Sequence, residues 1–244
     1  MDLDLSALLA PRYLAWLWQG LLTTLWSALL VIVASTLLGL GLAGAREFGG
    51  PVWRTASRLY LSVFRNTPLL VQLFFWYFGL PALLPPGVLP WLNTPHELAL
   101  GSVTLLRWPS FEMLAALVGL VAYSTAYVGE DIRSGLRGVP AGQRLAALAL
   151  GFTPLQVLRQ VVFPQALRLA ATPLIGQFMN ILKNTSLAMA IGLVELSYRT
   201  RQVEAETWKT FQVYGVSTLL YVAAIAGLAV LGQAWQRHLT RHLR

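Results

Sequence analysis

The chain has 244 residues, of which 56% are hydrophobic and only 11% charged, and its mean hydropathy of +0.60 excludes an ordinary soluble domain. Its net charge of +8 could suggest nucleic-acid binding, but the basic residues are spread between apolar segments, so we expect no nucleic-acid partner. The chain has no cysteine, and its three histidines (His96, His238, His242) lack ligand spacing, so we expect no disulfide and no metal site.

Five apolar stretches predict transmembrane helices, because a spanning helix needs about 20 mostly apolar residues. Pro68 lies in the first third of the second stretch, where we expect a kink, and Pro81 is expected to end that stretch. A Pro-rich connector of little charge follows. We therefore predict an all-α membrane protein with a single transmembrane domain over residues 1–244. Its spans cover approximately residues 14–44, 59–84, 112–129, 169–195 and 211–236.

The distribution of basic residues predicts the orientation in the membrane. With the amino terminus outside, twelve basic residues fall on the inner side and five on the outer side, as the positive-inside rule requires. The carboxyl terminus then faces the cytoplasm, and residues 129–168 form the largest cytoplasmic feature. The amino-terminal stretch lacks the positive flank of a cleavable signal, so we expect the first span to remain in the mature chain.

The segment between the third and fourth spans indicates two short helices that meet at a corner. Pro140 suits the first turn of a helix, and Gly151 is expected to end that helix. Thr153 is the expected N-cap of the second helix, with Gln156 at the reciprocal capping-box position. Pro164 is expected to end or bend this second helix. Periodicity alone leaves open that the pair simply lies on lipid headgroups.

The segment contains Ala146-Ala147, then Gly151, then Val161-Val162-Phe163-Pro164. This spacing resembles the cytoplasmic EAA motif of ABC importer permeases. The family pattern is Glu-Ala-Ala, three residues, Gly, nine residues, then Ile-x-Leu-Pro, and its Glu falls on Leu145 here. The stretches EDIRSGLRGVPAGQ, KNTSLAMAIGLVEL and FRNTPLLVQLFFWYFGLP are similar to the polar-amino-acid branch of that family. The matches run from about residue 13 to residue 237, so the chain is identified as a member of this family.

The resemblance implies a MetI-like permease with five transmembrane helices and a cytoplasmic coupling-helix pair, over residues 140–164, between helices 3 and 4. It also implies partners, namely ABC ATPase subunits, a second permease that is identical or different, an extracytoplasmic solute-binding protein, membrane lipid and an amino acid substrate. The expected location is the bacterial cytoplasmic (inner) membrane. The residues expected to couple to the ATPase are Ala146, Ala147, Gly151, Phe152, Val161, Phe163 and Pro164.

Nothing in the sequence predicts catalysis by the chain itself. It contains no GxxxxGK[ST] phosphate loop, so we expect ATP and Mg²⁺ to be bound by the partner ATPase, with no cofactor here. A membrane enzyme would need paired carboxylates, a metal cluster or a nucleophile with its base, and the spans carry no such set. An ion-coupled secondary transporter would usually show a doubled, inverted repeat, which five spans and one coupling unit do not.

A few polar residues inside the spans are candidates for a translocation path. A charge within a span usually faces water or the bundle interior, although a lysine can instead reach the interface. Pro68 leaves the carbonyl of Phe64 without its helical partner, which could line a cavity, with a packing role equally open. The predicted path residues are Asn66, Thr67, Lys183, Asn184 and Glu195.

For the acidic residues and the substrate, alternatives stay open. Glu195 could pair with Arg199 at the i, i+4 spacing or form a gate, and Glu130 with Arg133 is expected to join a solvated charge network. The similarity of YLAWLWQG and of FRNTPLLVQLFFWYFGLP favours the branch that imports glutamate and aspartate. Glutamine, arginine and histidine are the alternative substrates.

Overall fold

The computed structural model describes residues 10–94, 97–100, 103–107 and 109–240. The amino-terminal stretch discussed above, up to residue 9, lies outside the described residues. The same is true of two histidines and two of the inner basic residues, namely His96, His242, Arg241 and Arg244.

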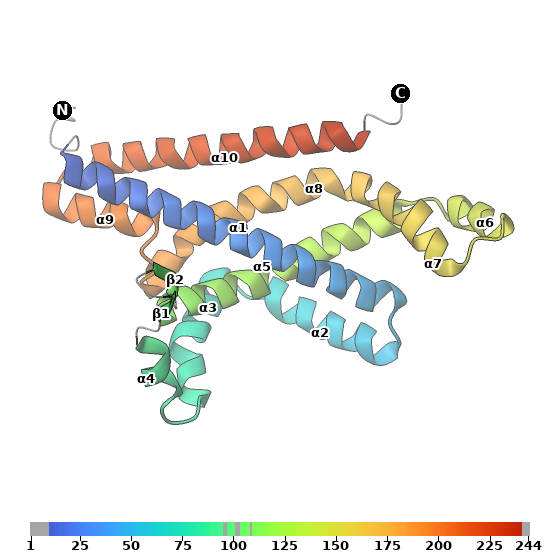
Figure 1. Cartoon of the computed structure of the whole chain (residues 1–244), viewed down its shortest axis with the longest axis horizontal. Coiled ribbons are helices and arrows are strands. Elements are labelled where there is room, and N and C mark those ends of the chain that lie inside the picture. The colour runs from blue at the N-terminus through green and yellow to red at the C-terminus, as the bar shows by residue number, and fades with distance from the viewer. Residues whose placement is uncertain (1–9, 95–96, 101–102, 108, 241–244) are drawn as a thin grey trace. The chain divides into compact units, whose positions relative to one another are not determined.

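Helices make up nearly all of the described chain, with one short β-hairpin (Figure 1). The all-α class is thus confirmed, apart from this hairpin. The α-helices and strands, in chain order, are α1 (Pro11–Phe48), α2 (Pro51–Asn66), α3 (Leu69–Phe74), α4 (Val88–Asn93), β1 (Glu97–Leu100), β2 (Val103–Arg107), α5 (Phe111–Gly138), α6 (Ala141–Ala149), α7 (Pro154–Gln156), α8 (Phe163–Asn184), α9 (Leu196–Thr207) and α10 (Thr210–Thr240).

The residues form two compact units, each assembled from three stretches of chain. Unit 1 comprises Met1–Val31, Thr67–Ala122 and Asn184–Leu220, and unit 2 comprises Ile32–Asn66, Tyr123–Lys183 and Tyr221–Arg244. The long helices α1, α5 and α10 contribute residues to both units. Neither unit is a continuous stretch of sequence, so neither could be recognised from composition along the chain.

Three helices of the described chain are long and apolar enough to cross a membrane, namely α1, α5 and α10. They coincide with the predicted first, third and fifth spans. The predicted second and fourth spans correspond to interrupted helices, so the total of five spans stays a prediction.

The interruption in the second predicted span is a full break at Pro68. Helix α2 ends at Asn66, Pro68 is extended with φ −61° and ψ 138°, and α3 begins at Leu69. The sequence predicted only a kink here. After α3 the chain continues as a π-helical turn, Phe75–Gly79, and a 3₁₀ turn that ends at Leu83, shortly after Pro81, as expected.

Three features were not predicted from the sequence: helix α4, the β1–β2 hairpin and helix α9. The connector after the second span contains α4 and the antiparallel β1–β2 hairpin, in which Leu98 pairs with Leu106 and a bulge follows Leu98. Its strands are too short for a clear alternating pattern. Helix α9 was missed because it is mostly polar; it begins after Glu195 and ends at Trp208, whose φ is +55°.

Small residues allow close helix contacts within each unit. In unit 2, a Cβ added to Gly135 of α5 would lie 2.5 Å from the carbonyl oxygen of Ala166 on α8. In unit 1, a Cβ on Gly20 of α1 would lie 2.9 Å from the Cα of Leu196 on α9. Such approaches increase the van der Waals contact that holds helices together in membranes, where water does not drive them together.

We expect Gly135→Ala to destabilise unit 2, because the added methyl group would meet backbone that cannot rotate away and would force α5 and α8 apart. Overpacking of this kind costs about 1–3 kcal/mol. Thermal unfolding of the purified protein in detergent measures the effect. Gly176→Ala on α8 is the control, since a Cβ there meets no atom within 4 Å. Equal melting temperatures for the two variants would contradict the close contact.

Candidate functional site

The corner between α6 and α7 is built by two local capping motifs in unit 2. Helix α6 ends as the sequence predicted, at a left-handed glycine, Gly151, with φ +86°. The amide of Phe152 donates to the carbonyl of Ala147 at 3.2 Å, and the amide of Gly151 donates to that of Leu148 at 3.0 Å. This pair of bonds is a Schellman motif, which satisfies carbonyls that the end of a helix leaves open.

The predicted capping box at the start of α7 is confirmed. The Thr153 hydroxyl accepts from the Gln156 amide at 3.3 Å, and the Gln156 side chain accepts from the Thr153 amide at 2.8 Å. Pro154 occupies the first helical turn, where its missing N–H costs nothing. The corner is therefore defined on both sides by hydrogen bonds within the loop itself.

Pro164 does not end the second helix. The chain passes from α7 through a π-helical turn, Val157–Val162, directly into α8, and Phe163 keeps helical dihedral angles. A wider turn before Pro164 gives its ring room beside the preceding carbonyls, which is why a proline here is compatible with a continuous helix. Figure 1 shows the resulting α6–α7 hairpin beyond the adjoining ends of α5 and α8.

A side chain that the sequence did not single out ties α6 to α5. Arg144 Nη2 donates to the carbonyl of Leu136 at 2.9 Å, in the last turn of α5. A cation at this position also interacts favourably with the negative end of the helix dipole. Only the fold brings these two residues together.

The predicted coupling residues differ in exposure. Ala147 is buried, Val161 and Pro164 are half-buried, and the remaining four, Ala146, Gly151, Phe152 and Phe163, are exposed. Around them the hairpin presents large apolar side chains to the outside, which periodicity alone did not predict. The exposed leucines are Leu145 (66% exposed), Leu148, Leu150 and Leu155 (72% exposed).

The break after α2 is stabilised by a buried glutamine. In unit 1, Gln72 Nε2 donates to the Thr67 carbonyl at 3.1 Å and to the Thr67 hydroxyl at 2.7 Å, and the Gln72 amide donates to Pro68 O. The side chain thus satisfies backbone groups that the break removes from the helix. Sequence analysis expected a kink at Pro68 but missed both the full break and the role of Gln72.

The fourth predicted span changes from an α-helix to a 3₁₀ helix at a sequence similar to that of the break after α2. Helix α8 ends at Asn184, and Thr185–Ile191 follow as a 3₁₀ helix that ends at Gly192, with φ +89°. The two breaks read RNTPL, from residue 65, and KNTSL, from residue 183. In unit 1, α3 contacts this 3₁₀ helix, so the segments that follow the two breaks pack together. Lys183, at the end of α8, is exposed.

Glu195 is a buried helix cap. Its side chain is 0% exposed, Oε1 accepts from the Tyr198 amide at 2.9 Å, and Oε2 accepts from the Thr24 hydroxyl at 3.3 Å. The Thr24 hydroxyl oxygen also accepts from the Leu196 amide at 3.2 Å. The carboxylate therefore joins α1 to the start of α9 and lies at the positive end of the α9 dipole, which stabilises its charge.

A charged network in unit 2 connects α1, α2 and α5. Glu130 contacts the guanidinium group of Arg46 and lies 3.7 Å from Arg65 Nη1 and 3.8 Å from Arg133 Nη1. Glu47 lies 3.5 Å from Arg133 Nε. The predicted network around Glu130 is confirmed, but it crosses between helices and is partly buried: the Arg46 side chain is only 15% exposed.

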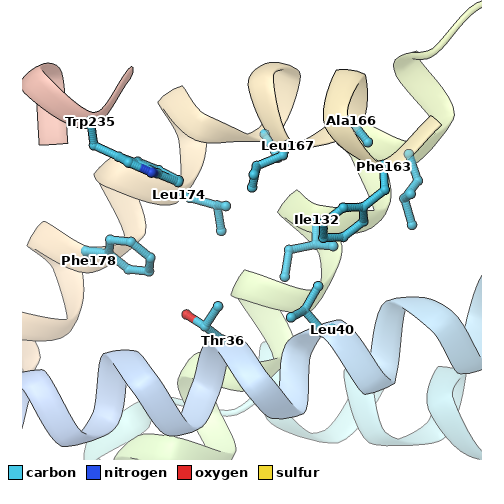
Figure 2. Close-up of a pocket in the computed structure, with 11 residues that line it drawn as sticks. Thr36, Leu40, Ile132, Phe163, Ala166, Leu167, Leu174, Phe178 and Trp235 are labelled. Atoms are coloured by element: carbon cyan, nitrogen blue, oxygen red, sulfur yellow. The ribbon is translucent and has the colours of Figure 1, made fainter. Parts of the chain in front are cut away.

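Two cavities of unit 2 have opposite chemistry. The first has a volume of about 210 Å³ and is lined almost wholly by apolar side chains from α1, α5, α8 and α10, among them Leu40, Ile132, Phe163 and Trp235 (Figure 2). It offers no partner for the charged groups of an amino acid. The second, of about 380 Å³, is lined by Arg46, Arg58, Leu61, Ser62, Arg65, Asn66, Tyr127 and Glu130.

Comparison with known proteins assigns the family. The family model described as "Binding-protein-dependent transport system inner membrane component" matches residues 35–244. The chain belongs to this family. It is 33% identical over 213 residues to the probable amino-acid ABC transporter permease protein PatM of Vibrio harveyi, covering 87% of this permease and 86% of PatM.

Other similar proteins carry different substrate names. The permease is 30% identical over 214 residues to the glutamate/aspartate import permease protein GltJ of Escherichia coli, covering 86% of this chain and 81% of GltJ. It is also 30% identical over 231 residues to the probable glutamine permease protein GlnP of Bacillus subtilis, covering 93% and 95%. The crystal structure of an amino acid ABC transporter with histidines matches with a TM-score of 0.80 at 26% identity, covering 98% of this chain and 100% of that one.

The permease is therefore an inner-membrane subunit of an amino-acid ABC transporter. Members of this family are transport subunits, so it is not an enzyme. Its helices α1, α5 and α10 agree with a membrane location. In the described part of the permease, no three metal-ligating side chains come together.

We expect Glu195→Ala to destabilise the permease by about 2 kcal/mol, because it removes an N-cap acceptor and leaves the Thr24 hydroxyl and the Tyr198 amide without that partner. Glu195→Gln keeps an acceptor oxygen and should lose less. Thermal unfolding in detergent measures both variants.

The matched control is Glu206→Ala on the same helix, whose partner Arg12 is 2.8 Å away in an exposed ion pair. Exposed pairs contribute little to stability. A larger loss of stability at Glu206 than at Glu195 would refute the importance of the buried cap.

Proposed function

We propose that the permease forms the translocation path of an ATP-driven importer for polar amino acids and that glutamate and aspartate are its substrates. The name of GltJ supports the acidic substrates, while the names of relatives at the same identity keep glutamine as an alternative, with arginine and histidine beside it. The geometry of the α6–α7 corner carries the importer mechanism. Its hydrogen bonds hold an exposed apolar surface in one shape.

In this mechanism the corner is the docking element for the partner ATPase subunits, which bind ATP and Mg²⁺. Exposed apolar patches on a protein mark sites of interaction, and the leucines of the hairpin form such a patch. Leu145 occupies the position of the family's Glu, and its exposed side chain adds apolar contact area in place of the carboxylate.

The roles of the predicted coupling residues follow from their exposure. We assign contact with the ATPase to Ala146 and Phe152, because their side chains are exposed on the hairpin. Phe163 is only 40% exposed and lines the apolar cavity, so we assign it a role in joining the corner to the transmembrane helices. Gly151 gives the corner its shape through its positive φ. The other three support the corner from inside unit 2 or from the adjoining helix: Ala147, Val161 and Pro164.

Movement of the corner would pass directly to the transmembrane helices. The second arm of the corner continues without a break into α8, and Arg144 ties the first arm to the end of α5. When the ATPases close on ATP, the corner and the adjoining parts of α5 and α8 would therefore move together. We propose that this movement alternates access to the path.

The remaining partners follow from the same proposal. A second permease completes the path, and an extracytoplasmic solute-binding protein delivers the amino acid. The amino terminus lies outside and the carboxyl terminus in the cytoplasm, with five spans in one transmembrane domain. Exposed apolar side chains on α10, such as Leu219, Val230 and Leu231, would face lipid or the second permease.

Along the path, the two broken helices supply the polar groups. We assign Asn66 and Lys183 to the lining, because Asn66 borders the polar cavity and Lys183 is exposed at the end of α8. Thr67 and Glu195 position the chain, since both hold local hydrogen bonds. Asn184 is the last residue of α8, at the point where the break begins.

We expect Gly151→Val to uncouple the importer, because a β-branched residue is strongly disfavoured at φ +86° and would change the shape of the corner. A left-handed conformation costs a residue with a side chain about 1–2 kcal/mol, so ATP-dependent uptake should fall about tenfold or more. Uptake is measured in liposomes that contain the permease, its ATPase and its receptor.

Gly151→Asn is the control at the same position, since asparagine tolerates this conformation and keeps the amide. It should retain uptake within about twofold, while both variants insert and accumulate like the parent protein. Full uptake by Gly151→Val at normal abundance would refute the proposed role of the corner.

Competition for uptake identifies the substrate. In the same liposomes, unlabelled aspartate should reduce uptake of radiolabelled glutamate more than glutamine, arginine or histidine does, because only aspartate shares both carboxylates. Stronger competition by arginine or histidine would overturn the acidic assignment. Proton-driven uptake by the permease alone would overturn the ATP-driven mechanism.

A further inference from the structure

The polar cavity of unit 2, hereafter the basic cavity, has a large excess of positive charge. Its lining carries three guanidinium groups, from Arg46, Arg58 and Arg65, against one carboxylate, from Glu130. Of the neighbouring acidic residues, Glu47 lies close to Arg133 and Arg137. Asp131 forms a side-chain hydrogen bond with Gln177 and also interacts electrostatically with Arg65.

Glu130 does not neutralise the three arginines. It contacts Arg46 and also lies 3.7 Å from Arg65 and 3.8 Å from Arg133, so one carboxylate is shared among several cations. Arg58 Nε donates to the backbone carbonyl of Arg54 at 3.3 Å, a neutral acceptor. The positive charge at Arg58 is therefore available to an anion, together with the part of the Arg65 charge that Glu130 and Asp131 leave uncompensated.

Arg58 and Arg65, two of the three arginines of α2, are accessible and partly oriented. The Arg65 side chain is 44% exposed, and its guanidinium carbon lies 5.3 Å from the centre of the Tyr127 ring, a cation–π contact that limits its freedom. Arg58, Ser62 and Arg65 lie at i, i+4 and i+7, and so on one face of α2. A guanidinium group binds a carboxylate through two parallel hydrogen bonds.

The lining favours a free solute over a lipid. Leu61 is its only apolar member, whereas a lipid headgroup would bring acyl chains that need apolar contact. An apolar groove does run along α2, bordered by Trp53, Ala56 and Tyr60, but these residues lie on a different face of the helix from Arg58 and Arg65. A volume of about 380 Å³ lies within the range of small-molecule sites.

We propose that the basic cavity binds the side-chain and backbone carboxylates of an acidic amino acid, with Arg58 and Arg65 as the anchoring groups. Arg46, held by Glu130, adds positive charge behind them. This inference rests on the proposed function, since it specifies the substrate class within the permease itself. With the predicted orientation, the site lies at the inward end of the path.

The test is direct binding to the permease–ATPase complex in nanodiscs, without the receptor. Radiolabelled glutamate should bind, and glutamine of the same shape should compete about tenfold more weakly, because its side-chain amide cannot form the charge-assisted bonds of the glutamate side-chain carboxylate. Arg58→Gln and Arg65→Gln should each weaken glutamate binding about tenfold. Arg54→Gln, on the same helix but outside the lining, is the matched control and should bind like the parent complex.

Competition with other anions distinguishes an amino acid carboxylate from inorganic phosphate and from a lipid headgroup. The carboxylate site would be overturned if inorganic phosphate displaced glutamate as readily as aspartate does. It would also be overturned if anionic lipid in the nanodisc displaced glutamate. The site would also be overturned if the parent complex did not bind glutamate, or if both arginine variants bound it as tightly as the parent complex does. Among the described residues, Arg58 has no ion pair in the charged network, so Arg58→Gln should keep the melting temperature even if Arg65→Gln lowers it.

Failure of the site and failure of the proposed function are distinguishable. If receptor-dependent glutamate uptake is normal in the parent importer and unchanged in both arginine variants, the site falls and the function stands. If the parent importer carries another amino acid instead, the proposed acidic function falls.

Discussion

Every backbone amide and carbonyl of a membrane-embedded chain must find a partner, because lipid offers none. The permease interrupts its helices in several places, and each interruption for which contacts are described has a local solution. Gln72 satisfies the backbone at Thr67, the Glu195 carboxylate caps α9, and the amides after α6 return to its last carbonyls. The polar residues in the apolar segments are therefore needed first for the architecture, and function uses the groups that remain accessible.

Which features could be predicted depends on how far apart in sequence the interacting residues lie. Contacts within a few residues were predictable: the capping box of Thr153 and Gln156 and the glycine end of α6 are set by local chemistry, and both are confirmed. Pro164 shows the limit, because its effect depends on the π-helical turn before it. The sequence alone could not resolve that turn.

Contacts between distant segments could not be read from periodicity. Glu130 meets Arg46, which lies 84 residues earlier on another helix. Even Arg144 and the carbonyl of Leu136, only eight residues apart, meet because the chain turns between α5 and α6. Sequence analysis counted the arginines among the inward-facing basic residues but considered each helix separately. It likewise could not show that the leucines of the α6–α7 hairpin are exposed, since a helical pattern fits buried leucines equally well.

The cap at Glu195 has a consequence for how the protein is made. Its partner Thr24 lies 171 residues earlier in sequence, on α1. Glu195 is therefore synthesised long after Thr24 and has to meet an α1 that is already in place. The start of α9 takes its final form only after that meeting, and until then the acidic side chain needs water or another protein to solvate it. Membrane insertion of this chain thus depends on the order in which its parts arrive.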